Sequence, residues 1–252
     1  MRLTPSNKIV IIPALLVAGA LGLQALAQQR APLPPADFLP NCMKLIEQKR
    51  YAEARSLLEP VLAEHPDWPR AKFYLALTYH KENRYGAARE LYERVLELDP
   101  QYHSVRLFYG WCLYYLGELG PARAMFEAFL AAKPDYPDAI FALGLIDFDS
   151  DEIESARARF LEAIELAEQK GDTRTEAKSR ARLADLLVRT GKLAAARAEL
   201  ERSIELNPRN YEAHFKLSRV LDRLGDSAGA AAARARHQQM LERAHPGAGG
   251  GP

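Results

Sequence analysis

The chain has 252 residues, of which 48% are hydrophobic and 27% charged, an ordinary globular composition with room for one large domain or an array of small units. Its formal net charge is only +1, which argues against dedicated nucleic-acid binding or anionic-surface binding, because such proteins carry a basic excess. Ligand recognition must therefore be sought in local patches.

The first residues predict export. A basic start precedes an apolar run over residues 9–23, and a small-x-small pattern typical of a signal-peptidase site ends at Ala27. We interpret residues 1–27 as a signal peptide; the alternative is an uncleaved inner-membrane anchor, because residues 9–27 approach the roughly 20 residues that span a bilayer. Both interpretations place the rest of the chain outside the cytoplasm, in the periplasm, and the second makes residues 9–27 a membrane tether.

A proline-rich linker is predicted next, over residues 28–34. Cys42 and Cys112 are the only thiols of the chain, and two cysteines in an oxidising compartment suggest a disulfide. The repeat described below separates them by two full units, too far for Cα atoms that must come within about 7 Å. We expect both to be small, buried side chains.

A repeat of 34 residues covers most of the remaining chain. Pro66, Pro100 and Pro134 are 34 residues apart in similar phrases, and Pro208 follows 74 residues later, which is two repeats and an insertion of 6. Between these prolines the apolar residues recur at helical spacing, with one polar turn per unit. Each unit is therefore predicted to be two antiparallel helices, closed by a proline that disfavours further helix.

The recurring core residues resemble the tetratricopeptide repeat family, whose pattern has small residues at positions 8 and 20, an aromatic at 24 and proline at 32. Three units carry the resemblance most fully: Leu75, Ala76, Tyr79, Ala88, Tyr92, Val95 and Pro100; Tyr109, Gly110, Leu113, Ala122, Phe126, Phe129 and Pro134; Leu143, Gly144, Ala156, Phe160 and Ala163. Weaker copies flank them.

The resemblance implies an all-α fold, a right-handed α-solenoid of about six helix-turn-helix units. The units are expected near residues 35–68, 69–102, 103–136, 137–176, 177–210 and 211–245, followed by a disordered tail over 246–252.

One unit departs from the pattern. Glu168 stands at position 32 of the fourth unit, so its second helix is expected to run to about Lys170 with Gly171 as its C-cap. Thr173 and Glu176 then have the spacing of a capping box for the next helix.

The stretch FYGWCLYYLG (108–117) is apolar nearly all round its predicted helix, so a second surface besides the core has to be explained. In the family, one face of each first helix lines a concave groove. We predict that this face forms an aromatic groove for a partner: Phe73, Leu77, His80, Leu107, Trp111, Tyr114, Tyr115, Phe141, Leu145 and Phe148. The alternative is that rings such as Phe108 and Tyr115 pack between repeats.

Farther along, the same face becomes basic. A basic end of the groove, attracting an acidic or carboxylate-bearing ligand, is predicted from Lys178, Arg182, Arg189, Arg219 and Arg223. The alternative is a set of solvated cations paired with neighbouring acids. Lys178 and Arg182 match part of the family's carboxylate clamp, but Leu107, Trp111 and Ala142 stand where that clamp needs polar residues, which disfavours it.

No motif indicates catalysis. The stretch DFDSDE (147–152) starts like a calcium loop but lacks the loop's glycine and closing glutamate, so helix capping by Ser150 or Asp151, with Glu154 reaching back, is the preferred interpretation. The six histidines show no close metal pairing, and no phosphate loop or nucleophile motif occurs. We predict no metal, no cofactor and no enzyme activity.

The function predicted from these features is a non-catalytic interaction scaffold outside the cytoplasm, with an extended peptide or a partner helix in its aromatic groove and no nucleic-acid partner. The first alternative is a carbohydrate-engaging scaffold of exopolysaccharide secretion, for which Asp138 and Asp149 are the only carboxylates near the rings. The second alternative is a purely structural assembly subunit.

Overall fold

The computed structural model describes residues 32–244, so the predicted signal peptide or anchor over 1–27 and the tail over 246–252 lie outside the described residues. Within 32–244 every regular element is a helix, which confirms the predicted all-α fold. The helices are α2 (Phe38–Glu47), α3 (Tyr51–Glu64), α4 (Pro69–Lys81), α5 (Tyr85–Leu98), α6 (His103–Tyr115), α7 (Leu119–Ala132), α8 (Pro137–Asp149), α9 (Ile153–Lys170), α10 (Thr173–Arg189), α11 (Leu193–Leu206), α12 (Tyr211–Leu224) and α13 (Ser227–Ala244).

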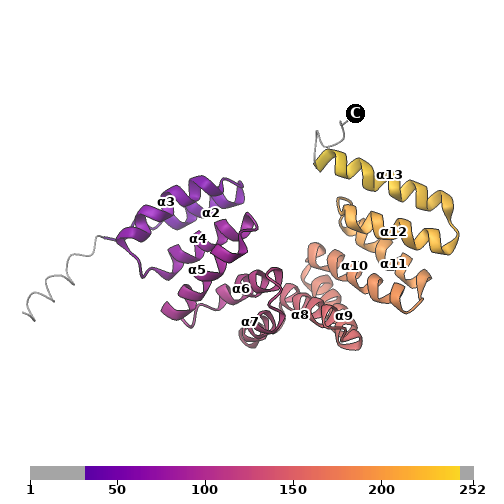
Figure 1. Cartoon of the computed structure of the whole chain (residues 1–252), viewed down its shortest axis with the longest axis horizontal. Coiled ribbons are helices and arrows are strands. Elements are labelled where there is room, and N and C mark those ends of the chain that lie inside the picture. Colours follow the sequence, from indigo (N-terminus) through magenta and orange to yellow (C-terminus); the bar gives the residue numbers. More distant parts are fainter. Residues whose placement is uncertain (1–31, 245–252) are drawn as a thin grey trace, which may run out of the picture.

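Consecutive helices form six pairs that stack along an arc, from α2 and α3 at one end to α12 and α13 at the other (Figure 1). Each pair packs against the next, so the core is a continuous series of small clusters. The first helices α6, α8 and α10 are direct neighbours, since α8 contacts both α6 and α10.

Proline ends the second helix of a pair as the 34-residue spacing predicts. Helix α5 ends at Leu98 and α7 ends at Ala132, each two residues before its proline. The residue preceding the proline has left the helical conformation in both cases, with φ of −141° at Asp99 and at Lys133. The proline ring disfavours the helical conformation in the residue before it.

The turn inside every pair has one residue in the left-handed region, at the same place in each unit. These residues have φ between 60° and 83°: Lys49, Asn83, Gly117, Asp151, Gly191 and Gly225. Glycine adopts this conformation without a Cβ clash, and short polar residues such as Asn and Asp tolerate it.

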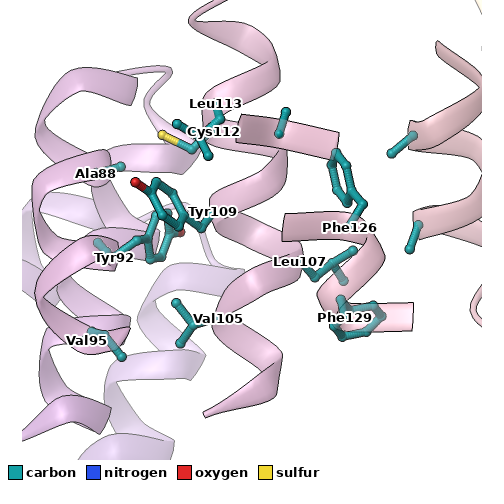
Figure 2. Packing of buried hydrophobic residues seen from close by; sticks show 14 of the residues in the cluster. Ala88, Tyr92, Val95, Val105, Leu107, Tyr109, Cys112, Leu113, Phe126 and Phe129 are labelled. Atoms are coloured by element: carbon teal, nitrogen blue, oxygen red, sulfur yellow. The ribbon is translucent and has the colours of Figure 1, made fainter. Parts of the chain in front are cut away.

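The core between α5, α6 and α7 shows why small residues recur at fixed places (Figure 2). The ring of Phe126 is fully buried, and a Cβ atom at Gly110 would lie 2.8 Å from it. The same arrangement returns one unit later, where a Cβ atom at Gly144 would lie 2.7 Å from the ring of Phe160. A glycine on the first helix therefore makes room for an aromatic ring on the second.

The fourth unit lengthens as predicted, but the capping prediction is wrong by one residue. Helix α9 runs to Lys170, and Gly171 follows it at φ 67°. The N-cap of α10 is Asp172, whose carboxylate accepts the amide of Thr175 at 3.0 Å. Glu176 does not reach back to Thr173; it is buried and pairs with Arg180 at 2.9 Å, one turn farther along. The carboxylate of Asp172 already satisfies the amide of Thr175, and Glu176 is engaged by the guanidinium of Arg180, which explains the difference.

The capping interpretation of DFDSDE is also wrong. Ser150 follows the end of α8 as its C-cap, and Glu152 precedes α9 without any side-chain capping bond. Asp151 instead accepts a hydrogen bond from Arg189 at 2.6 Å. The carboxylate of Asp147 is drawn into the core by two arginines from neighbouring helices.

Both cysteines are free and fully buried, as predicted from their repeat positions. The thiol of Cys112 donates to the carbonyl oxygen of Tyr85 at 3.0 Å. Burial raises the pKa of Cys112 to about 12, so this sulfur stays a protonated packing group rather than a reactive thiolate.

Candidate functional site

A pocket of about 500 Å³ lies among four first helices, α4, α6, α8 and α10. Most of its lining comes from α6 and from the start of α8 and α10. The lining residues are His80, Lys81, Leu107, Phe108, Trp111, Tyr115, Tyr136, Asp138, Phe141, Asp172, Arg174, Thr175 and Lys178. We refer to this site as the central pocket.

Aromatic rings in contact with one another form the floor of the central pocket. The ring centroid of Trp111 lies 5.9 Å from that of Tyr115 and 6.3 Å from that of Phe141. Tyr115 also stacks on Tyr85 at 4.7 Å, yet its side chain remains 52% exposed. The floor is thus held rigid by ring packing on one side and is open to solvent on the other.

An ion pair lies against this floor and links three helices. Asp138 on α8 accepts a hydrogen bond from Nε1 of Trp111 on α6 at 2.9 Å, and its other carboxylate oxygen pairs with Nζ of Lys178 on α10. The same Nζ lies 4.4 Å from the ring centroid of Phe141, a cation–π distance. These contacts fix the orientation of the tryptophan and place the pair beside apolar surface.

Tyr114 lies next to the pocket and is fixed in a similar way. Its hydroxyl donates to Asp149 on α8 at 2.8 Å. Burial, and then this hydrogen bond, raise the pKa of Tyr114 above its usual value, so the phenol stays protonated at neutral pH. Phe148 lies under the guanidinium of Arg189, 5.6 Å from the ring centroid.

The predicted aromatic groove divides into two sets in the structure. His80, Leu107, Trp111, Tyr115 and Phe141 line the central pocket together. The other five do not line it: Tyr114 and Phe148 are half-buried beside it, while Phe73, Leu77 and Leu145 are buried in the packing between helices.

The predicted basic end is largely neutralised by neighbouring acids. Lys178 pairs with Asp138 and Arg189 with Asp151, as the alternative interpretation expected.

Arg182 contacts Asp185 at 3.3 Å and Glu212 at 3.6 Å, and so belongs to the same paired set. The guanidinium of Arg219 lies 5.9 Å from the ring centroid of Phe215. Arg219 and Arg223 line a separate pocket of about 150 Å³ between α10, α11 and α12.

Two cations of the central pocket were missed by the sequence analysis. Lys81 is the last residue of α4, and Arg174 is the second residue of α10. The prediction took residues at equal positions in successive units, whereas the pocket runs obliquely, from the C-terminal end of α4 to the N-terminal end of α10. How far the first helix of one unit is displaced along its axis relative to the first helix of the next unit could not be predicted from repeat positions alone.

His80 borders the central pocket as a neutral ring. It makes edge contacts with Tyr85 at 5.4 Å and Phe108 at 6.3 Å, and its Nδ1 is buried with no hydrogen-bond partner in the described chain. Burial, with a smaller contribution from Lys81, lowers the pKa of His80 to about 4. Protonation would place an unpaired charge among aromatic rings.

We expect the free energy of unfolding of the wild type to fall, relative to a His80→Phe variant, as the pH drops. An unfolded histidine takes up a proton near pH 6.5, whereas folded His80 does so only near pH 4, so the loss runs through this window. Between pH 7 and pH 4.5 the wild type should lose about 2–3 kcal/mol relative to the variant. Urea unfolding of both proteins at the two pH values measures this, and an unchanged gap would contradict the neutral assignment.

Residues 32–244 contain no group of three His, Cys, Asp or Glu side chains arranged to hold a metal ion. No helix in that range is long and apolar enough to cross a membrane.

Most of the described chain resembles a known protein family. A family model described as tetratricopeptide repeat matches residues 44–103, 110–171 and 181–248, and a second model with the same description matches 79–128. A search of curated protein sequences finds no match.

Solved structures share the fold at low sequence identity. The APC/C hetero-tetramer Cut9–Hcn1 matches with a TM-score of 0.72 and 17% identity over 89% of this chain, which spans only 43% of the chain it matches. PilW, a type IV pilus biogenesis factor, matches with a TM-score of 0.68 and 19% identity over 84% of this chain and 94% of its own. YrrB, described as having an unusual peptide-binding site, gives 0.50 and 18% over 73% and 91%.

Proposed function

The chain belongs to the tetratricopeptide repeat family, and we propose that it is a non-catalytic scaffold whose central pocket holds a segment of another protein. The observation that supports this most directly is the floor of the pocket, where Trp111 and Tyr115 offer apolar surface at the bottom of a concave site and the buried ring of Phe141 supports them from below. Preorganised aromatic surface of this kind commonly supplies the anchoring contacts of protein interfaces.

The expected ligand is an extended peptide or a partner helix, outside the cytoplasm. A peptide-binding site is described for the structural neighbour YrrB, and PilW is described as a type IV pilus biogenesis factor; both are consistent with this proposal. The location rests on the signal-peptide interpretation of residues 1–27.

The geometry favours a protein ligand over a sugar. Stacked sugars need hydrogen-bonding side chains beside the rings, and Asp138 and Asp149 were the candidates for that role. Asp138 already accepts from Trp111 and pairs with Lys178, and Asp149 accepts from the hydroxyl of Tyr114. Carboxylates engaged by the rings themselves have less capacity left for sugar hydroxyls.

We expect a photoreactive residue at position 136 to crosslink a specific partner in cells that express the full chain. Tyr136 lines the pocket with 37% of its side chain exposed, whereas Leu161 on α9 is 45% exposed and lies outside it. The photoreactive group at 161 is therefore the matched control. The mass of the recovered chain also shows whether it starts at Gln28, after signal cleavage.

Adding Tyr115→Ala should reduce crosslinking at position 136 by at least about tenfold, since loss of an anchoring ring costs about 2 kcal/mol or more and about 1.4 kcal/mol is a factor of ten. Tyr211→Ala removes a ring of similar exposure, 49%, from α12 and should leave the yield unchanged. Circular dichroism confirms that both variants are folded. Equal yields from positions 136 and 161, or no effect of Tyr115→Ala, would remove the pocket as the binding site.

A further inference from the structure

The two cations missed by the sequence analysis lie on the first and the last, in chain order, of the four helices that line the central pocket. Lys81 is the last residue of α4 and Arg174 is the second residue of α10, and both side chains are exposed. Within residues 32–244 neither one forms an ion pair or a side-chain hydrogen bond. They differ in this respect from Lys178, whose charge is matched by Asp138.

The acidic residues of the pocket are committed to other partners. Asp138 is held by Trp111 and Lys178, and Asp172 caps α10 by accepting the amide of Thr175 at 3.0 Å. The carboxylate of Asp172 also faces the positive end of the α10 dipole, which offsets part of its charge. Both acidic side chains of the pocket are therefore engaged, and the two exposed charges in its lining without a partner, on α4 and α10, are positive.

Apolar surface separates the two cations. The floor between them is made by Trp111, Tyr115 and Phe141, and no charged side chain other than the Lys178–Asp138 pair interrupts it. A matching ligand needs an apolar side chain for the floor and anionic groups on either side of it. A nucleic acid would present phosphates but would find only two unpaired cations, far fewer than the contacts that drive its binding.

We propose that the central pocket recognises a segment of a partner protein in which an apolar side chain is flanked on both sides by aspartate or glutamate. This inference rests on the proposed function, that the pocket holds a partner segment at all. The inference specifies in addition that the bound segment is negatively charged, and it assigns the selection of that charge to Lys81 and Arg174.

The test uses a displayed library of random twelve-residue peptides, selected on the immobilised full chain in low salt. Enriched peptides should carry Asp or Glu on both sides of a central apolar residue. The double variant Lys81→Glu, Arg174→Glu should bind those peptides at least about tenfold more weakly and should enrich basic flanks instead. Binding to the wild type should also weaken at 0.5 M salt.

A matched control variant changes the net charge of the protein by the same amount at a place outside the central pocket. Lys192→Glu with Arg209→Glu reverses two exposed cations outside the pocket and should leave the selection unchanged. Tyr115→Ala separates the two hypotheses. If enriched peptides need Tyr115 but show no acidic bias, or keep that bias in the Lys81 and Arg174 variant, the charge inference is wrong while pocket binding stands. If the same peptides bind Tyr115→Ala equally well, the proposed function itself fails.

Discussion

Replacing Asp147 with alanine should lower the free energy of unfolding by about 3–5 kcal/mol. The Asp147 side chain is completely buried on α8. Its Oδ1 accepts from Nη1 of Arg123 on α7 at 2.7 Å, and its Oδ2 accepts from Nε of Arg159 on α9 at 2.7 Å. One carboxylate thus joins the third and fourth helix pairs. Its loss leaves Arg159 without a counter-charge and leaves Arg123 with only the more distant carboxylate of Glu152, at 3.6 Å.

A triple variant distinguishes charge from packing. The equivalent places in the two preceding units are Tyr79 and Leu113, so the position accepts an uncharged side chain. Arg123→Met, Asp147→Leu and Arg159→Met together remove all three charges, and this variant should unfold within about 1 kcal/mol of the wild type.

Urea unfolding followed by circular dichroism measures both proteins. Equal losses in the single and triple variants would mean that side-chain volume matters at this place. A loss below 1 kcal/mol for Asp147→Ala alone would contradict the role assigned to the buried carboxylate.

The fold was predictable because a repeat restates its constraints in every unit. Gly110 and Gly144 stand opposite Phe126 and Phe160, so the same small and large partners appear at the same spacing twice. Proline spacing adds the helix ends independently of the core. The same pattern remains recognisable in the less regular outer units. The helix pairs could therefore be placed without tertiary information.

The charge network was much less predictable, because each partner depends on how one unit sits on the next. Asp147 looks like a capping or metal-binding residue in sequence, but its partners lie 24 residues before it and 12 residues after it. Lys178 meets Asp138 across 40 residues. These separations match no local rule, so the sequence could name the charged residues but not pair them.

The candidate site falls between these two cases. Trp111, Tyr115 and Phe141 were identified because aromatic residues left over from the core need a second explanation. Lys81 and Arg174 had no such signal, since an exposed cation at a helix end is ordinary. What makes these two relevant is the oblique course of the pocket across four helices, which is a property of the stacked units and not of any single one.

Replacing Phe160 with alanine should cost about 3–5 kcal/mol, because its ring is fully buried and fills the space over Gly144. In the wild type, Gly144→Ala should be destabilising by about 1–3 kcal/mol, since the added Cβ would lie 2.7 Å from the ring of Phe160. Both changes lie inside the core of the fourth helix pair and are measured by urea unfolding.

The sign of Gly144→Ala should reverse once the ring is gone. In a Phe160→Ala background the clash with the ring disappears and only the 3.2 Å approach to Cβ of Arg159 remains. Alanine is a better helix former than glycine by about 1 kcal/mol, so the second change should stabilise the protein. Gly110 and Phe126 repeat the test one unit earlier, where the added Cβ would lie 2.8 Å from the ring. If Gly144→Ala destabilises both backgrounds equally, the glycine is needed for the backbone of α8 and not for the ring, and the reason given for its place in the repeat is wrong.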